Sequence, residues 1–342
     1  MDSIKAFVGI DVSKKKLDIA LLRDNKVKPK AIPNTAAGFE QIEKWLVFQK
    51  VDLASVWICL EATGPYSDSL ATWLDDHGFK VSVVNPARIK GYAQSELVRN
   101  KTDKSDAATI ARFCQSIKPE QWHAPSAQIR VLRALVDRLD ELKQTRQQEL
   151  NRIEAYQSQQ QELLIDGVQK HIDWLSAEID KLQSEIDDHF DNNPDLKKDA
   201  DLIQSIPGMG SISTAKFMAY VGDISRFDNA KALAAFAGVT PRNRRSGTSV
   251  RGRAMISRMG NTQLRTALYM PGLVARRHNP TLKAFADRLS ERGMKNKAVI
   301  GAVSRKLVHI IFGVIKSENP FDPKLGHKPL ASQDGICPQY YA

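Results

Sequence analysis

The sequence predicts an α/β domain over residues 1–124, an α-helical coiled-coil connector over 125–198, a mainly α-helical part over 199–325 and a tail over 326–342. Three observations predict this division. Short apolar runs alternate with amphipathic stretches in the first part, a heptad repeat runs through the second, and helical patterns led by glycine follow in the third. With 342 residues, the chain is long enough for two or three domains.

The first part reads as strands and helices in a defined order. Strands are expected at residues 6–10, 16–23, 28–34, 56–60 and 80–84, and helices at 39–47 and 66–77. Three antiparallel strands followed by alternating helices and parallel strands are typical of a ribonuclease H-like fold. In that fold the first and fourth strands are neighbours, so the residues that end them lie close together.

Four acidic residues in this part are candidates for catalysis. Asp11 and Glu61 end two apolar runs, while Asp103 and Asp106 lie three residues apart where a helical pattern begins. The latter pair could simply cap a helix and face its dipole, but acids at strand ends have no such explanation. We therefore expect the four carboxylates to converge on Mg²⁺, with Mn²⁺ as an alternative, since oxygen ligands suit both ions.

Charge points to a polyanionic partner. The chain has a formal net charge of +11, and residues 240–316 hold 17 Lys or Arg but only two acids. A surface built for solubility alone usually mixes both signs. The concentration of positive charge therefore favours nucleic acid over a role in solubility.

Cysteine spacing and hydropathy indicate the cellular compartment in which the protein is expected to work. Cys59, Cys114 and Cys337 are widely spaced and form no metal-binding pattern with the scattered histidines. No signal-like segment opens the chain, and no membrane-spanning run of about eighteen apolar residues is recognisable. We expect a cytoplasmic, nucleoid-associated protein without a membrane partner.

The connector carries a regular apolar seam. Val168, Ile172, Leu175, Ile179, Leu182 and Ile186 are spaced four, three, four, three and four residues apart. Gly167 is expected to separate this helix from an earlier, less regular one. The two helices either fold back on each other or pair with another chain, and the pattern favours an oligomer.

The third part begins with a turn of the form Pro-Gly-x-Gly. Gly208 and Gly210 lead into a helix, where free backbone N–H groups can face an anion. This is similar to a helix-hairpin-helix element, which holds the DNA backbone. Further helices are expected at residues 227–237, 264–274 and 298–314, and the tail from 318 is expected to be loosely ordered.

A second candidate site is an arginine-rich segment at residues 238–253. Guanidinium groups match phosphate oxygens, and hydroxyl side chains between them could bind phosphate or attack it. Residue chemistry alone does not choose between these roles, or between Ser246, Thr248 and Ser249. The arginines are Arg242, Arg244, Arg245, Arg251 and Arg253.

Six short motifs run in order along the chain, from about residue 5 to about residue 322: VGIDVSK (8–14), LEATGPY (60–66), NKTDKSDA (100–107), SIPGMG (205–210), FAGVTP (236–241) and SGTSVRG (246–252). Together they resemble the DEDD transposases of the insertion-sequence "one-ten" family, the bridge-RNA-guided recombinases. Where Thr248 stands, that family often has a second serine.

The resemblance implies a RuvC-like first domain and a C-terminal transposase domain. Asp11, Glu61, Asp103 and Asp106 then correspond to the magnesium-binding tetrad, and Ser246 to the nucleophilic serine. Lys101, together with the two glycines and five arginines above, is expected to contact nucleic acid.

The implied activity is that of an RNA-guided, site-specific DNA recombinase of a bacterial-type insertion sequence. It would excise and integrate the element through a covalent phosphoserine–DNA intermediate. Its partners would be an element-encoded bridge RNA, donor and target DNA, and further copies of the chain, as a dimer that forms a tetramer in synapsis. The halves of the site could come from different subunits. One alternative is a RuvC-like junction-resolving endonuclease that uses water, and another is a non-catalytic nucleic-acid scaffold.

Overall fold

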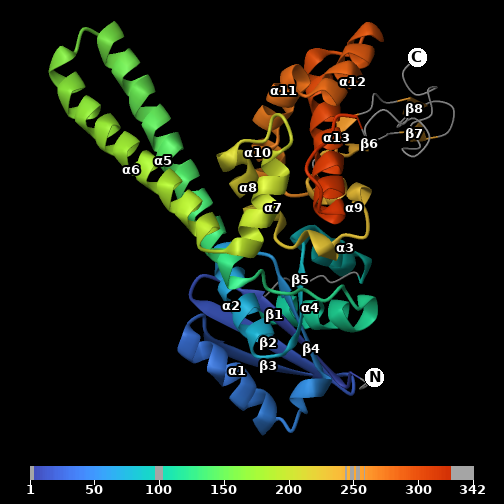
Figure 1. The fold of residues 1–342 in the computed structure, drawn as a ribbon. Helices are drawn as coiled ribbons and strands as arrows, with labels where there is room; N and C mark the ends of the chain where they lie inside the picture. Colours follow the sequence, from blue (N-terminus) through green and yellow to red (C-terminus); the bar gives the residue numbers. More distant parts are fainter. Residues whose placement is uncertain are drawn as a thin grey trace. The chain divides into compact units, whose positions relative to one another are not determined.

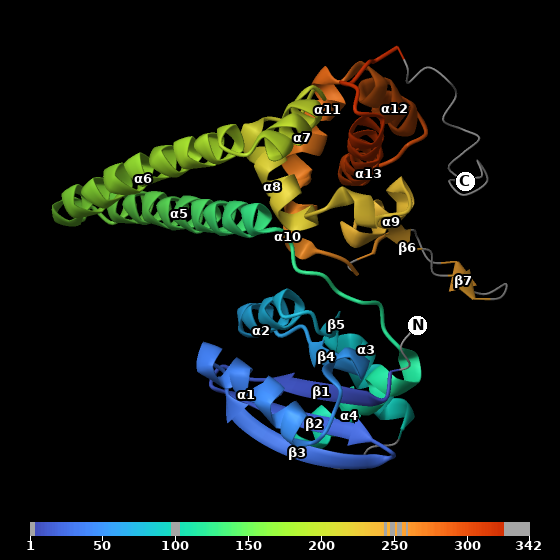
Figure 2. The same cartoon turned by 60° about the horizontal axis from the view of Figure 1, so that its bottom comes forward.

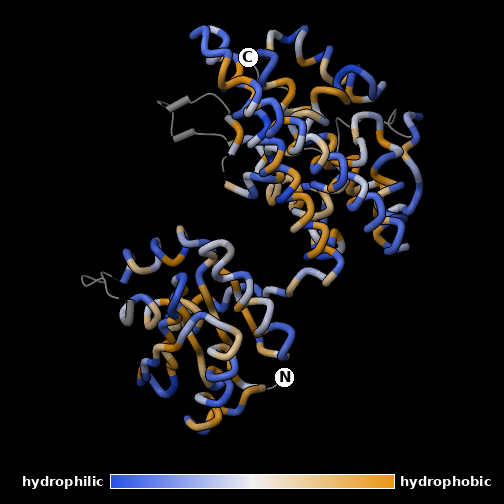
Figure 3. The backbone as a smooth tube through the Cα atoms, turned by 90° about the vertical axis from the view of Figure 1, so that its left-hand side faces the viewer, coloured by the Kyte–Doolittle hydropathy of each residue, from blue (hydrophilic) through white to orange (hydrophobic). Residues whose placement is uncertain are grey.

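The chain forms two compact units, Met1–Ala124 and Pro125–Ala342 (Figures 1 and 2). The structure is a computed structural model that describes residues 4–96, 103–242, 245–246, 250–251, 255–257 and 259–324. The boundary expected near residue 198 falls within the second unit. In Figure 3, hydrophobic stretches run through the inside of each unit, and hydrophilic ones lie on the outside.

A five-stranded mixed sheet forms the centre of the first unit. Its order is β3-β2-β1-β4-β5, where β1 to β3 are antiparallel and β4 and β5 run parallel to β1. This confirms an α/β domain. The strands are β1 (Ala6–Val12), β2 (Lys16–Arg23), β3 (Lys26–Pro33), β4 (Val56–Glu61) and β5 (Lys80–Val84).

Each face of the sheet has its own hydrophobic core. The even-numbered residues of β1 pack with α1 (Ala36–Phe48) and α2 (Pro65–Asp76). Odd-numbered residues of β1 and β4, such as Phe7 and Cys59, pack with α3 (Pro86–Ser95) and α4 (Asp103–Ile117). Because successive strand residues face opposite sides, these clusters fix which side chains lie beneath α4.

The second unit begins with a helical hairpin. Helix α5 (Ala127–Ser158) packs along α6 (Ile165–Asp191), with the short 3-10 turn η2 (Glu162–Leu164) between them. The seam residues from Ile172 to Ile186 are buried in this pairing within one chain, so the seam itself gives no argument for a second subunit. Gly167 was expected to separate the helices, but it lies inside α6. The reversal uses Gln160 instead, at a positive φ of 57°.

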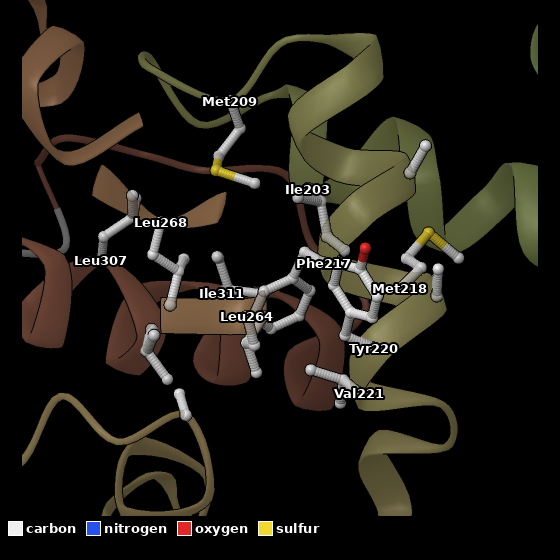
Figure 4. Packing of buried hydrophobic residues seen from close by; sticks show 14 of the residues in the cluster. Ile203, Met209, Phe217, Met218, Tyr220, Val221, Leu264, Leu268, Leu307 and Ile311 are labelled. Carbon is white, nitrogen blue, oxygen red and sulfur yellow. The ribbon is translucent and has the colours of Figure 1, made fainter. Parts of the chain in front are cut away.

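Within the described residues of the second unit, eight further helical segments follow the hairpin. They share one hydrophobic cluster with the hairpin, in which Phe217, Leu264, Leu268 and Ile311 meet (Figure 4). The segments are α7 (Pro194–Gln204), α8 (Ser211–Val221), η3 (Ile224–Arg226), α9 (Ala230–Phe236), α10 (Thr262–Ala267), α11 (Tyr269–His278), α12 (Pro280–Glu291) and α13 (Asn296–Ser317).

The helix expected at 264–274 is interrupted at Leu268, which ends α10 and precedes α11. Pro271 explains the break, because proline has no N–H and its ring clashes with the carbonyl four residues earlier. Proline is tolerated in the first turn of the new helix, which is where Pro271 lies. The expected single helix is therefore two.

Helix α13 lies in the core of the second unit. Among the described residues it is the one helix long and apolar enough to cross a membrane. Val299, Val303, Leu307 and Ile311 are nevertheless fully buried against other helices. Its apolar character is thus explained by core packing.

Candidate active site and nucleic-acid interface

Asp11 and Glu61 lie on adjacent strands and on the same side of the sheet. The register pairs Ile10 with Leu60, and each acid is the next residue along its strand. On β1, Asp11 points to the same face of the sheet as Phe7, four residues earlier. On β4, Glu61 points to the same face as Cys59, two residues earlier. Both carboxylates are half-buried and belong to the side covered by α4.

Helix α4 approaches this side very closely at Gly9. A Cβ atom built on Gly9 would lie 2.2 Å from the carbonyl oxygen of Ala107 and 2.3 Å from the nitrogen of Ala111. Gly9 therefore permits a backbone contact that other residues would block. Asp106 directly precedes Ala107, so this half-buried acid belongs to the first turn of the helix that packs on the Asp11 side of the sheet.

Asp18 is a further acid on this side of the sheet, and together Asp11, Glu61 and Asp18 form an acidic row across β4, β1 and β2. It is the direct partner of Asp11 across β1 and β2, and its side chain is only 7% exposed. Lys16, two residues earlier on the same side of β2, places its Nζ 2.8 Å from Asp18 Oδ2. Sequence reasoning missed Asp18, although counting back through the short β1–β2 turn would have paired it with Asp11.

The acidic row offers the right donor chemistry for a hard divalent cation. Carboxylate oxygens are the preferred ligands of Mg²⁺ and Mn²⁺. The side chain of Asp103 lies outside the described part of the structure, although its backbone begins α4. Within the described residues, no three Asp, Glu, His or Cys side chains form a metal-binding group. The acids thus supply suitable ligands from three elements, without a closed set.

Two short antiparallel ribbons lie within and directly after the arginine-rich segment. In one, β7 (Arg245–Ser246) pairs with β8 (Val250–Arg251), so that Arg245 faces Arg251 and Ser246 faces Val250. In the other, β6 (Pro241–Arg242) pairs with β9 (Met255–Ile256). Thr248, Ser249, Arg244 and Arg253 lie outside the described residues, as does Lys101.

The two glycines of the Pro-Gly-x-Gly turn differ in their surroundings. Gly208 has a φ of 110°, and a Cβ there would lie 2.7–2.9 Å from atoms of Ala275 in α11. Its conformation and packing therefore account for this glycine. Gly210 is exposed and precedes α8 without a side-chain cap, so it leaves the N–H groups of that helix accessible.

Comparison with known proteins identifies relatives along almost the whole chain. A pilin gene-inverting protein from Moraxella bovis is 33% identical over 322 residues, which cover 94% of this chain and 99% of the relative. A model described as the transposase IS116/IS110/IS902 family matches residues 200–287, and a transposase model of the DEDD type matches 8–159. The chain belongs to the IS110 family of DEDD transposases.

Other relatives of this IS110-family transposase agree. The pilin gene-inverting protein of Moraxella lacunata is also 33% identical over 322 residues. The transposase for insertion sequence element IS1111A from Coxiella burnetii is 25% identical over 299 residues, covering 77% of this chain and 79% of the relative. The protein is therefore an enzyme of the transposase and recombinase class that acts on DNA, and its family implies a divalent metal ion.

Proposed function

We propose that this transposase is an RNA-guided, site-specific DNA recombinase that excises and integrates an insertion sequence through a phosphoserine–DNA intermediate. The observation that carries the proposal is the row of Asp11 and Glu61 beneath α4, whose first turn contains Asp103 and Asp106. Full-length similarity to a protein named for inverting a gene supports strand exchange rather than simple degradation.

In the proposed reaction, Ser246 is the nucleophile. Its Oγ attacks phosphorus, a new Oγ–P bond forms, and the bond from phosphorus to the sugar oxygen of the leaving strand breaks. The hydroxyl proton passes to solvent, and the leaving oxygen takes up a proton. Attack by a second DNA end reverses these steps, so the phosphoester bond is conserved and no nucleotide cofactor is needed.

The carboxyl groups of Asp11, Glu61, Asp103 and Asp106 are the proposed ligands of Mg²⁺ or Mn²⁺. A bound divalent ion neutralises charge on the scissile phosphate and orients it. Two observations support these ligands: Asp11 and Glu61 end adjacent strands, and α4, which contains Asp106, packs closely on β1 at Gly9.

Recognition of sequence is assigned to a bridge RNA that pairs with donor and target DNA. Protein contacts to the backbone are then sufficient, and the arginines of the 238–253 segment are proposed to supply them. Gly210, Lys101 and the remaining arginines are proposed to add backbone contacts. Strand exchange between two DNA segments also requires more than one copy of the chain, so a dimer or tetramer is proposed.

The serine assignment can be tested with a matched pair of variants. Ser246→Ala should abolish the protein–DNA adduct seen on a denaturing gel, whereas Ser249→Ala, three residues away, should retain it. Both variants should keep wild-type affinity for RNA. Adduct formation by the Ser246→Ala protein would contradict the serine mechanism.

A water-using, junction-resolving endonuclease is a second candidate. It is favoured by one observation: all four proposed metal ligands lie in the first unit, whereas Ser246 lies in the second. Such an enzyme would cut branched DNA without any adduct, and the Ser246→Ala variant would cut as fast as the wild type. The same gel therefore separates the two reactions.

A further inference from the structure

Helices α11, α12 and α13 of the second unit line an open pocket of about 410 Å³. It lies where α11 ends, α12 runs past, and α13 begins. None of its lining residues belongs to the arginine-rich segment at 238–253. They are Leu273, Arg276, Arg277, Lys283, Asp287 and Asn296.

The pocket carries an excess of basic side chains, and few acidic side chains neutralise their charge. Three of its six lining residues are basic and one is acidic. Arg276 donates both terminal nitrogens to Asn296 Oδ1, at 3.4 and 3.5 Å. Within the described part of the chain, the side chains of Arg277 and Lys283 have neither an ion pair nor a hydrogen bond, and Asp287 forms no ion pair with them. Positive charge thus accumulates without an internal partner.

The end of α11 and the start of α13 also affect the electrostatic potential of the pocket. Basic residues in the last turn of α11 suit the negative end of its dipole, which by itself is an ordinary stabilising arrangement. That explanation fails for α13, where the N-cap is Lys295, no acid lies in the first turn, and no side chain caps the free N–H groups. A positive helix terminus beside three cations is unfavourable unless an anion lies between them.

We propose that this pocket holds a backbone phosphate of the nucleic acid on which the transposase acts. The Arg276 and Arg277 guanidinium groups supply fork-shaped donors, Lys283 supplies a point charge, and the Asn296 amide orients Arg276. A volume of about 410 Å³ exceeds that of several waters, at about 30 Å³ each, and accommodates a phosphodiester group. Inorganic phosphate, DNA and RNA share this chemistry.

Helix α13 runs from the pocket to β9, whose partner strand β6 belongs to the arginine-rich segment. Asn296 lines the pocket, and at Gly301 the same helix packs against Ile256 of β9, since a Cβ there would lie 2.7 Å from Ile256 Cδ1. Five residues of helix rise about 7.5 Å, roughly two base-pair steps of 3.4 Å. The position on α13 that lines the pocket and the position that packs on β9 are therefore separated, along the helix, by about two nucleotide steps of one strand.

The inference rests on the proposed action on nucleic acid, and salt dependence of binding tests it. Full-length protein is titrated with labelled duplex DNA, single-stranded DNA and an RNA hairpin at several salt concentrations. The double variant Arg277→Gln/Lys283→Gln should show a shallower slope of log affinity against log salt, by about 0.7 to 0.9 for each phosphate that the variant no longer neutralises. The control Lys170→Gln/Lys181→Gln removes the same charge from α6 and should leave the slope unchanged.

A third variant makes the opposite prediction. Asp287→Asn removes the acid among the six lining residues and should tighten binding and raise the affinity of inorganic phosphate. A change confined to the DNA probes or to the RNA hairpin identifies the source of the phosphate and supports the pocket in either case. Unchanged slopes with all three probes, in protein that binds them normally, would overturn the inference alone. Wild-type protein that binds no probe would overturn the proposed function as well.

Discussion

Asp11 lies directly opposite Asp18 in the antiparallel pair of β1 and β2. Facing carboxylates repel each other, and burial strengthens that repulsion because less water screens it. Lys16 compensates at 2.8 Å from Asp18, and it is about half-exposed at the edge of the row. The acidic row therefore contains its own cation, which offsets part of the charge that a divalent ion would otherwise have to neutralise.

The first prediction concerns this cation. Lys16→Met leaves the buried carboxylate of Asp18 without its ion pair and should lower the free energy of unfolding by about 1–3 kcal/mol. Adding Asp18→Asn should recover part of the loss, because the unpaired charge and its repulsion of Asp11 disappear together. Urea unfolding followed by tryptophan fluorescence reports mainly the first unit, where four of the five tryptophans lie. A double variant less stable than Lys16→Met would contradict this account.

The second prediction concerns the contact between α4 and β1. Gly9→Ala places a methyl group 2.2 Å from a backbone oxygen, so α4 must move away. We expect a loss of about 1–3 kcal/mol and a weaker response to Mg²⁺ in calorimetry, since Asp106 moves with α4.

Gly91→Ala is the matched control for Gly9→Ala. Gly91 lies within α3 and has no atom within 4 Å of a built Cβ, so alanine there should stabilise the helix by about 0.5–1 kcal/mol. Equal stability of the two variants would show that the close approach at Gly9 is unimportant.

The first unit was largely predictable because its signals are local. Short runs with strand patterns predicted all five strands, and the ends of two apolar runs marked Asp11 and Glu61. Asp18 was missed because register, rather than residue type, places it opposite Asp11. Helices α3 and α12 were missed too, although each begins with proline after an asparagine whose side chain caps the helix. That Asn-Pro signature was available in the sequence.

Other features depend on contacts that a sequence pattern does not specify. A heptad seam shows which side of a helix is apolar, but not whether its partner is in the same chain, and here α5 covers it. The pocket between α11, α12 and α13 combines residues up to 23 positions apart, from Leu273 to Asn296. Charge counting detected its excess of cations, and only the packing of three helices brings them together.

The third prediction separates packing from ligand binding in the Pro-Gly-x-Gly turn. Gly208→Ala combines a φ of 110° with contacts of 2.7–2.9 Å to Ala275, and should destabilise the second unit by about 2 kcal/mol or more. Gly210→Ala meets no neighbouring atom at an ordinary φ of −91°, and should cost less than about 1 kcal/mol. Far-UV circular dichroism during urea unfolding measures both. If Gly210→Ala were the more damaging variant, the assignment of Gly208 to packing would be wrong.

The last prediction is a pH dependence that arises in α13. Burial, followed by the nearby charges of Arg305, Lys306 and Lys231, lowers the pKa of His309 to about 4. Its Nε2 also has no hydrogen-bond partner within the described residues. Between pH 6.5, the ordinary histidine pKa, and pH 4, the unfolded chain binds a proton that the folded chain excludes, so stability falls as the pH falls. Because the side chain is partly exposed, we expect a loss of about 1–2 kcal/mol from pH 7 to pH 5.

His309→Gln should remove this part of the pH dependence, whereas His278→Gln, at an exposed position of α11, should not. Urea midpoints at the two pH values decide the matter, and an identical pH response in wild type and His309→Gln would contradict the assignment.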